Sequence, residues 1–276
     1  RADAAVELIG EVRRYCPNAH IVYDTVDLHF LREQRLAKLT GDASTRRLAE
    51  YRQQEELGLI ALADSTLVVS PVERELLAQL APGADVRILS NIHRIPGRRT
   101  NFTDRRNIFF VGAFSHPPNV DAVLWFSRAI LPLILIKLPE LQFFIIGADP
   151  PAEVRSLSST SIHVLGHVPD LMPYLEGCRL SVAPLRYGAG VKGKVNLSLA
   201  HGLPVVGTST AVEGMFLEDG KSIFVADTPS EFAAAVAKIY LDSDIWECLS
   251  IEGIKVMEKY FSFNAARNAL FDLVGK

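Results

Sequence analysis

Three glycines and two lysines are concentrated in the segment Tyr187–Val195, and residues of these types could bind a phosphate. The segment follows an apolar run, Leu180–Leu185, which predicts a buried strand, and leads into a short helical pattern. A glycine-rich turn lets the backbone approach an anion closely, and the start of a helix offers free N–H groups and a partial positive charge. Lys192 and Lys194 would add two full charges. The segment therefore predicts a site for a negatively charged group, with a nucleoside diphosphate as the favoured ligand.

Part of the same segment matches the P-loop pattern G-x-x-x-x-G-K-[ST] at Gly188, Gly193 and Lys194. The last position of that pattern is Val195, which has no hydroxyl group for Mg²⁺, and no apolar run ends in the aspartate that a P-loop enzyme needs. A P-loop-like NTPase and an ordinary strand–helix turn with exposed lysines both stay open as alternatives. No His, Cys or carboxylate cluster has metal-ligand spacing, so we expect no metal and no cofactor.

Composition places the chain among globular proteins. It has 276 residues, of which 49% are hydrophobic, and a net charge of −3, which argues against a nucleic-acid partner. Its three cysteines, Cys16, Cys178 and Cys248, are far apart and form no C-x-x-C pair, which is typical of a reducing cytoplasm. The apolar stretch 122–146 is interrupted by charged residues and prolines, so we expect a buried helix and strand there, not a transmembrane segment.

The first part of the chain alternates helical and strand patterns, and it begins within a helical pattern at Arg1. We therefore expect a fragment of a longer protein that is inactive alone. Helices are predicted at 4–15, at 28–62 with a break near Gly41-Asp42, and at 71–80; strands are predicted at 20–23, 65–69 and 86–89. Ser70 to Glu73 matches a capping box with a proline at the first helical position. The polar, arginine-rich segment 91–107 predicts a linker, which divides a partial first lobe (1–100) from a second domain (101–276).

The second domain repeats strand–helix units. Strands are predicted at 108–111, 142–146, 162–165, 180–183, 204–206 and 222–225, with helices at 119–136, 152–157, 171–176, 191–200, 229–241, 245–260 and 264–274. Apolar strands alternating with amphipathic helices indicate an α/β fold, a doubly wound, Rossmann-like parallel sheet. Ligands of such sheets bind beyond the carboxyl ends of the strands. We expect five loops at that edge, 112–118, 147–151, 166–170, 188–194 and 207–214, to form one cleft facing the first lobe.

Taken together, these loops resemble the C-terminal donor domain of GT-B glycosyltransferases of family 4, the group 1 glycosyl transferases. In order along the chain, the resemblance is carried by Phe110–Asp121, Gly166–Asp170, Ala183–Val195, Ala200–Val206 and Glu213-Gly214. Segments 23–32, 63–70 and 90–92 resemble parts of the family's first lobe. The resemblance implies transfer of a sugar from a nucleoside-diphosphate sugar to a glycan or lipid-linked acceptor in polysaccharide or O-antigen-type biosynthesis, with retention of anomeric configuration. A catalytically silent nucleotide-sugar-binding module stays open as an alternative.

The resemblance also assigns roles to individual residues. Those implied to hold the donor diphosphate are Gly112, Gly190, Val191, Lys192, Gly193 and Lys194. Those implied to contact the nucleobase and ribose are Gly166, His167, Val168 and Asn196, and those on the sugar side are His116 and Glu213. Four charged residues usual in the family, two glutamates, an arginine and a lysine, are replaced here by Ala189, Leu197, Ala113 and Asn119 respectively. We expect the two lysines of the turn to supply the missing positive charge.

Asp27, His29 and Arg32 follow the predicted strand 20–23 and are the catalytic candidates. If a helix begins near Leu28, His29 and Arg32 share one face of it. The resemblance implies that this loop faces the cleft and touches the acceptor or the leaving phosphate. The alternative is that Asp27 caps the helix and Arg32 is a solvated charge.

The partners implied are a nucleotide sugar and a glycan or lipid-linked acceptor, with no nucleic acid and no transmembrane segment. The location expected is the cytoplasm, and a peripheral position at the cytoplasmic face of the inner membrane stays open.

Overall fold

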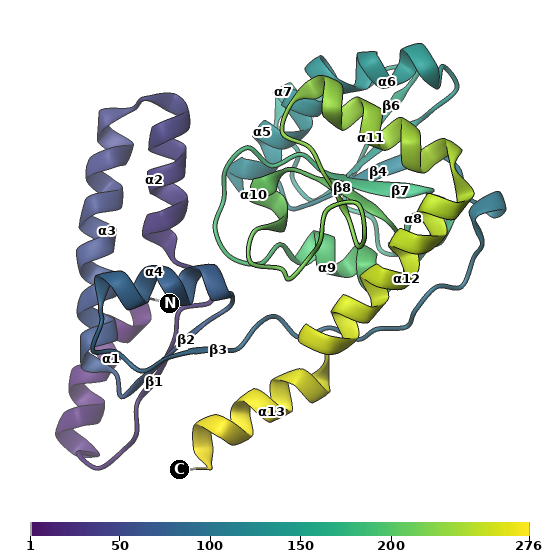
Figure 1. Cartoon of the computed structure of the whole chain (residues 1–276). Helices are drawn as coiled ribbons and strands as arrows, with labels where there is room; N and C mark the ends of the chain where they lie inside the picture. The colour runs from purple at the N-terminus through teal and green to yellow at the C-terminus, as the bar shows by residue number, and fades with distance from the viewer. Residues whose placement is uncertain (1, 276) are drawn as a thin grey trace.

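Two parallel β-sheets divide the structure into two lobes (Figure 1). The computed structural model describes residues 2–275, so Arg1 and Lys276 lie outside the described residues. The smaller sheet has the strand order β1 (Val22–Asp24), β2 (Ser65–Val68), β3 (Val86–Ile88). The larger sheet has the order β6 (Ile162–Gly166), β5 (Phe143–Ile146), β4 (Ile108–Val111), β7 (Leu180–Ala183), β8 (Val205–Gly207), β9 (Phe224–Val225). All described pairs of strands in both sheets are parallel, as the strand–helix alternation predicts.

The smaller lobe has four helices: α1 (Ala2–Tyr15), α2 (His29–Thr40), α3 (Ala43–Leu62) and α4 (Pro71–Leu80). Helix α4 packs on β2 and β3, whereas α1 and α2 both contact α3. The predicted break between α2 and α3 is confirmed, because Gly41 ends α2 with a left-handed φ of 72° and the side chain of Asp42 accepts hydrogen bonds from the first N–H groups of α3. The core of this lobe contains Phe30, Leu59 and Leu77, which come from three of the helices.

Helices cover both faces of the larger sheet, which confirms the doubly wound α/β fold. They are α5 (Pro117–Trp125), α6 (Leu131–Lys137), α7 (Ala152–Arg155), α8 (Met172–Gly177), α9 (Gly193–Ala200), α10 (Ser209–Val212), α11 (Pro229–Leu241) and α12 (Ser243–Tyr260). Neighbouring residues of a strand point to opposite faces. Phe110 accordingly joins the core cluster that contains Phe126 and Phe232, whereas Phe109 joins a second cluster with Leu175 of α8.

The apolar helix predicted at 119–136 is interrupted by a π-helical turn, η2 (Phe126–Ile130), between α5 and α6. Pro132 has no N–H group to donate one turn back, so the normal helical hydrogen-bond pattern cannot pass through this point. The whole helix, Pro117–Lys137, is long and apolar enough to cross a membrane by length and composition alone. Here its inner face, including Phe126, Ile130 and Ile134, is buried in the core of the larger lobe.

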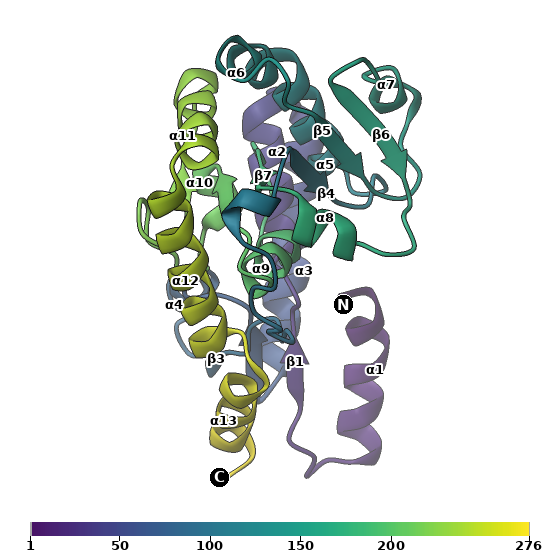
Figure 2. The ribbon, with the colours of Figure 1, turned by 90° about the vertical axis from the view of Figure 1, so that its right-hand side faces the viewer.

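The last helix, α13 (Phe263–Val274), returns to the smaller lobe (Figure 2). Arg87 of β3 donates from Nη1 to the carbonyl oxygen of Asp272 at 2.7 Å. The closing helix therefore contacts the first lobe. The segment between β3 and β4 contains one short 3₁₀ turn, η1 (Phe102–Asp104), and the boundary at residues 100 and 101 stays a prediction.

Candidate functional site

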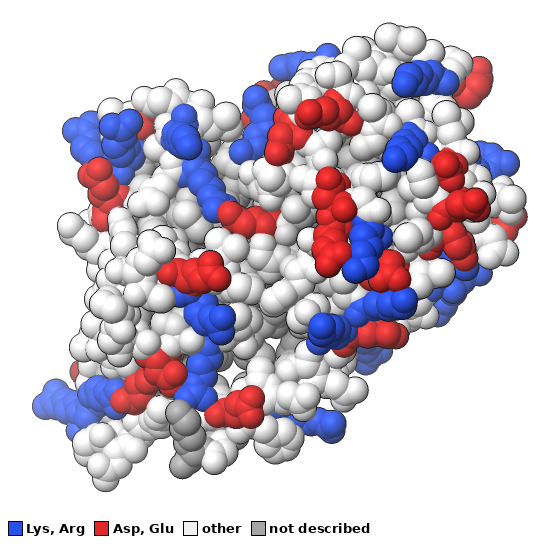
Figure 3. Space-filling view, in the orientation of Figure 1, with Lys and Arg blue, Asp and Glu red and all other residues white. Residues whose placement is uncertain are grey.

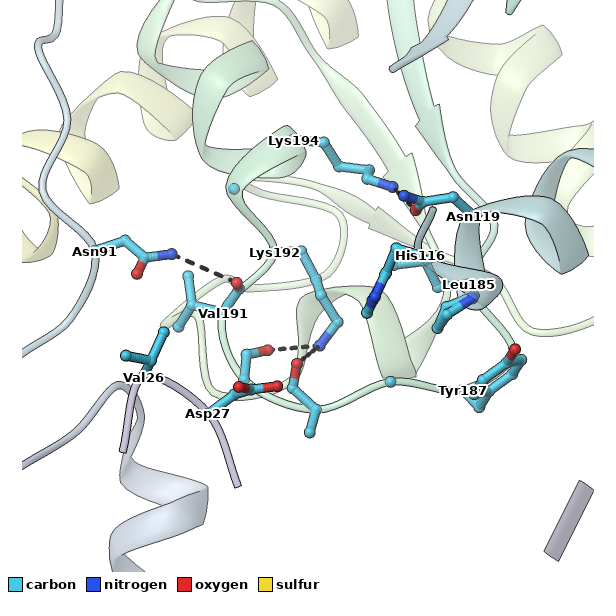
Figure 4. A pocket seen from close by; sticks show the side chains of 15 residues that line it. Val26, Asp27, Asn91, His116, Asn119, Leu185, Tyr187, Val191, Lys192 and Lys194 are labelled. Carbon is cyan, nitrogen blue, oxygen red and sulfur yellow. Dashed lines mark hydrogen bonds between the residues drawn. The ribbon is translucent and has the colours of Figure 1, made fainter. Parts of the chain in front are cut away.

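A cavity of about 250 Å³ lies between the lobes, at the carboxyl ends of β1, β4 and β7 (Figure 4). The loop after β1 contributes Val26 and Asp27, and the segment between the sheets contributes Asn91. The rest of its lining follows β4 and β7 and consists of His116, Pro118, Asn119, Leu185, Tyr187, Gly188, Ala189, Gly190, Val191, Lys192, Gly193 and Lys194. The structure thus brings together the predicted phosphate turn and one of the three catalytic candidates.

The turn before α9 needs its glycines because it lies against the first lobe. Gly190 has a φ of 66°, and a Cβ there would lie 3.0 Å from Cβ of Asp27 and 3.5 Å from Cγ2 of Val69. A side chain at this position would be strained both by the backbone conformation and by the contact. Asn91 also reaches the turn, donating to the carbonyl oxygen of Val191 at 3.5 Å. The turn is therefore held against residues of the first lobe and the linker.

Lys192 lies at the N-cap position of α9 and is only 8% exposed. Its Nζ donates to two carbonyl oxygens of its own turn, those of Ala189 at 3.1 Å and Gly190 at 2.5 Å. Burial lowers the pKa of Lys192 to about 8, against the opposing effect of Glu213. Among the described residues, no carboxylate lies at ion-pair distance from the ammonium group of Lys192. The ammonium group therefore has two carbonyl oxygens as partners but no full counter-charge.

The positive charge of Lys194 has fewer hydrogen-bond acceptors around it than that of Lys192. Its Nζ donates to Oδ1 of Asn119 and lies 4.2 Å from the centre of the Phe110 ring. Burial, and then the nearby charge of Lys192, lower the pKa of Lys194 to about 7. Gly112 leaves room for this arrangement, since a Cβ there would come within 2.9 Å of the lysine Nζ. An anion entering the cavity would supply the missing counter-charge and favour the protonated, charged form of both lysines.

Asp27, His29 and Arg32 form a connected group on the first-lobe side of the cavity. Nε2 of His29 lies 3.2 Å from Oδ1 of Asp27, and Nη1 of Arg32 donates to Oδ2 of Asp27 at 3.3 Å. The hydrogen bond from His29 counteracts burial and keeps the pKa of Asp27 below its usual value. Asp27 itself lines the cavity, so an ionised carboxylate faces the space below Lys192.

The start of α2 at His29 confirms that His29 and Arg32 lie three apart on one helix. The alternative role for Asp27 as the helix cap is wrong, because the N-cap residue is Leu28 and has no side-chain cap. Glu56 of α3 takes that place by accepting hydrogen bonds from the N–H groups of His29 and Phe30. Glu56 escaped sequence reasoning because it is one of several glutamates on a charged helix, and only its burial distinguishes it.

His116 lines the cavity beside the start of α5. Burial lowers the pKa of His116, and the positive charges of Arg32 and Lys194 act in the same direction. Its imidazole is therefore neutral near pH 7 and can both donate and accept a hydrogen bond. A neutral hydrogen-bonding ring, an ionised carboxylate and two under-compensated lysines suit a ligand that combines a phosphate with hydroxyl groups.

The model of the family described as glycosyl transferases group 1 matches residues 105–242, which is half of the chain. The chain belongs to the group 1 glycosyl transferases. A relative from Klebsiella pneumoniae, an uncharacterized 44.6 kDa protein in the cps region, is 24% identical over 136 residues. That match includes 46% of this chain and 35% of the relative, so the matched part spans about a third of the relative's length.

Solved structures of glycosyltransferases share the fold of this group 1 chain. Sucrose-phosphate synthase from Thermosynechococcus elongatus has a TM-score of 0.76 and 15% identity, and the match covers 96% of this chain and 69% of that one. HepE from Anabaena in complex with UDP-glucose has a TM-score of 0.72 and 12% identity, covering 100% and 77%. TarM from S. aureus has a TM-score of 0.71 and 12% identity, covering 82% and 47%. These likenesses establish the GT-B fold with Rossmann-like lobes.

The positions at which this group 1 chain departs from the family pattern now have a structural setting. Asn119 holds the Nζ of Lys194, so a lysine from α9 brings positive charge to the start of α5. Ala189 lines the cavity and offers it no charge. Leu197 packs in the apolar cluster with Phe109. Lys192 and Lys194 both line the cavity, and their role in replacing the missing positive charge stays a prediction. Neither Ala189 nor Leu197 carries a carboxylate in place of the two glutamates.

Two of the five loops expected to form one cleft, 112–118 and 188–194, line this cavity. The loop with Gly166, His167 and Val168 follows β6, which is separated from β7 by two strands, and it does not line the cavity. Asn196 does not line it either; it is fully buried, with no hydrogen-bond partner for its side chain among the described residues. The assignment of these four residues to nucleobase and ribose stays a prediction.

Glu213 belongs to a second cavity of about 450 Å³, which also contains Arg35 and Arg186. Arg35 of α2 donates to the carbonyl oxygen of Gly188 at 2.7 Å and pairs with Glu213 at 2.7 Å. The carboxylate of Glu213 is thus engaged between the lobes, and its sugar-side role stays a prediction. Throughout the range 2–275, no group of three or more His, Cys, Asp or Glu side chains is placed to hold a metal ion.

Proposed function

We propose that this chain carries the donor-binding part of a glycosyltransferase, which moves a sugar from a nucleoside-diphosphate sugar to a glycan or lipid-linked acceptor. The observation that carries the proposal is the pair Lys192 and Lys194, which both line one cavity at the start of α9. Among the described residues, neither lysine has a carboxylate at ion-pair distance. Buried cations at a helix N-terminus favour a bound anion. A diphosphate would bridge the two ammonium groups, with the N–H groups of the turn completing its contacts.

The nucleotide we favour is a uridine diphosphate. HepE was solved with UDP-glucose, and TarM with UDP and an α-GlcNAc-glycerol. We propose a role in polysaccharide or O-antigen-type biosynthesis, and the cps region of the Klebsiella relative loosely supports the polysaccharide part of that proposal. The surface drawn in Figure 3 supports a partner other than nucleic acid, because its basic and acidic side chains are interspersed on this face. A cytoplasmic location and peripheral contact with a membrane remain part of the proposal.

The reaction we propose proceeds with retention of anomeric configuration. Lys192 and Lys194 would stabilise the negative charge that develops on the leaving diphosphate. The leaving diphosphate would in turn help to accept the proton of the acceptor hydroxyl. Asp27 and His116 would hold sugar or acceptor hydroxyl groups from the two sides of the cavity. The contribution of the chain is then positioning and charge stabilisation without a metal.

Calorimetric titration of UDP, GDP, dTDP and CMP sugars against the protein, in excess EDTA, tests the proposal. We expect saturable binding of one or more members, with the uridine nucleotides strongest. If every member of the panel fails to bind, the proposed function is wrong.

A silent nucleotide-sugar-binding module is the second candidate, and Ala189 and Leu197 favour it because they remove two carboxylates usual in the family. Turnover measured with the full-length protein separates the two. Release of nucleoside diphosphate from the best-bound nucleotide sugar in the presence of a glycan acceptor supports the transferase, whereas tight binding without release supports the silent module.

A further inference from the structure

Glu56, His29 and Asp27 form a continuous line of charged groups from the interior of the first lobe to the cavity. We propose that Glu56 is a positioning residue of this site, which fixes the imidazole of His29 so that His29 fixes the carboxylate of Asp27. The inference rests on the proposed function, because it gives Asp27 a role in placing a hydroxyl group of the substrates.

The carboxylate of Glu56 is held rigidly. Glu56 is 2% exposed, and its Oε1 accepts from the N–H of His29 at 3.0 Å while Oε2 accepts from the N–H of Phe30 at 3.3 Å. These are free donors of the first turn of α2, so the partial positive charge of the helix start also favours the carboxylate. Oε1 of Glu56 also lies 3.3 Å from Nδ1 of the His29 ring. One carboxylate therefore sets both the start of α2 and the orientation of the ring.

The imidazole of His29 has a carboxylate at each nitrogen, Glu56 at Nδ1 and Asp27 at Nε2. A neutral ring carries one proton and would leave one nitrogen lone pair facing a carboxylate oxygen. The hydrogen bonds that the ring donates to Asp27 and then to Glu56 raise the pKa of His29 to about 9, against the opposing effect of burial. The ring is therefore an imidazolium at neutral pH, and it attracts both carboxylates at once.

The other charged groups nearby act on Asp27 rather than on the ring. Arg32 donates to Oδ2 of Asp27, and His116 across the cavity contributes a smaller effect on the same carboxylate. On the β1 side, burial raises the pKa of Tyr23 above its usual value, and Glu56 adds to that effect. Asp27 is thus fixed through both oxygens while it lines the cavity.

The first arm of the test is an NMR titration of the His29 ring in the wild type and in Glu56→Gln, with His29→Gln used to assign the signal. Glutamine keeps an oxygen for the N–H of His29 but removes the charge, so the imidazole pKa should fall by about one unit or more. Glu55→Gln is the matched control, since it makes the same change one position earlier on α3, where Glu55 pairs with Arg52. The control should titrate like the wild type.

The second arm uses the full-length protein and measures release of nucleoside diphosphate from the nucleotide sugar that binds best. Glu56→Gln should lower kcat by about 10- to 100-fold through misplacement of Asp27, while the Kd for the nucleotide diphosphate changes by no more than about twofold. A purely structural role would instead change the nucleotide Kd and kcat together. Glu55→Gln should leave both constants at the wild-type values.

An unchanged His29 titration in Glu56→Gln, a wild-type kcat, or a parallel loss of nucleotide affinity would each overturn the inference. A wild-type protein that binds no nucleotide sugar would instead overturn the proposed function, so the two failures are distinguishable.

Discussion

Two lysines at the start of α9 dominate the chemistry of the site. Lys192 has a pKa of about 8 and Lys194 of about 7, because burial disfavours the charged form of each and no carboxylate at ion-pair distance among the described residues compensates. The sequence allowed both to be predicted as phosphate-binding candidates, since a glycine-rich turn with two lysines is a local feature. Their burial could not be predicted, because it depends on residues such as Asn119 and Phe110, which lie far away along the chain.

Nucleotide-sugar affinity should decrease as pH rises. A lysine is charged below its pKa, and the anion binds the charged form, so binding is strongest below about pH 7 and weakens as pH rises through the values of Lys194 and Lys192. Calorimetry between about pH 6 and 8.5, in buffers of different ionisation enthalpy, should also show proton uptake on binding. The titration should use a nucleotide sugar and not a free nucleotide, because the terminal phosphate of a free nucleotide itself titrates at about pH 6.

Affinity that stays constant over this range, without proton uptake, would show that neither lysine changes its charge when the ligand binds.

At the scale of the elements, the sequence allowed most strands and helices to be located because periodicity and capping are local. The helices Pro71–Leu80 and Pro229–Leu241 and the strands Ile108–Val111 and Leu180–Ala183 have the predicted bounds. The short helix α10 has only four residues, too few for a periodic pattern, and the π-helical turn before Pro132 follows from a single missing donor. The sequence could not reveal that the loop after β6 does not line this cavity, because strand order in a parallel sheet is not encoded locally.

The turn before α9 gives a prediction about stability. Gly190→Ala should lower the free energy of unfolding by about 1–2 kcal/mol or more, because Gly190 has a φ of 66° and a Cβ would press on Asp27. Gly193→Ala is the matched control within the same turn, since nothing lies within 4 Å of the added Cβ and its φ is not in the left-handed region. The control should leave stability unchanged or raise it by up to about 1 kcal/mol.

Urea unfolding of the two variants and the wild type measures the effect. Equal stability of the two variants would contradict the backbone described for the turn.

At the scale of the whole molecule, the site depends on contact between the lobes. Arg35 of α2 donates to Gly188 at the edge of the phosphate turn and pairs with Glu213 of the larger lobe. A local pattern could not reveal this contact, because its partners are separated by more than 150 positions and the two lobes must first be placed side by side. Arg35 and Glu213 both line the second cavity, so the same contact lies beside it.

Arg35→Met should therefore loosen the phosphate turn. Loss of charge-assisted hydrogen bonds worth about 1.5–3 kcal/mol should speed amide hydrogen exchange in 188–192 by roughly 10- to 100-fold. Arg46→Met, at an exposed position of α3, is the control and should exchange like the wild type. Unchanged exchange in Arg35→Met would mean that the turn keeps its conformation without the first lobe.

The central claim is that Lys192 and Lys194 hold a nucleoside diphosphate in this cavity without a metal. The most direct measurement is a calorimetric titration of the best-bound nucleotide sugar, with excess EDTA and with Mg²⁺, against the wild type, Lys192→Ala, Lys194→Ala and the exposed-surface control Lys255→Ala. The account predicts equal wild-type affinity in the two conditions, a loss of roughly 10- to 100-fold in each cavity variant, and none in the control. Wild-type affinity in both cavity variants would place the phosphate elsewhere, and a loss of about tenfold on chelation would contradict metal-free binding.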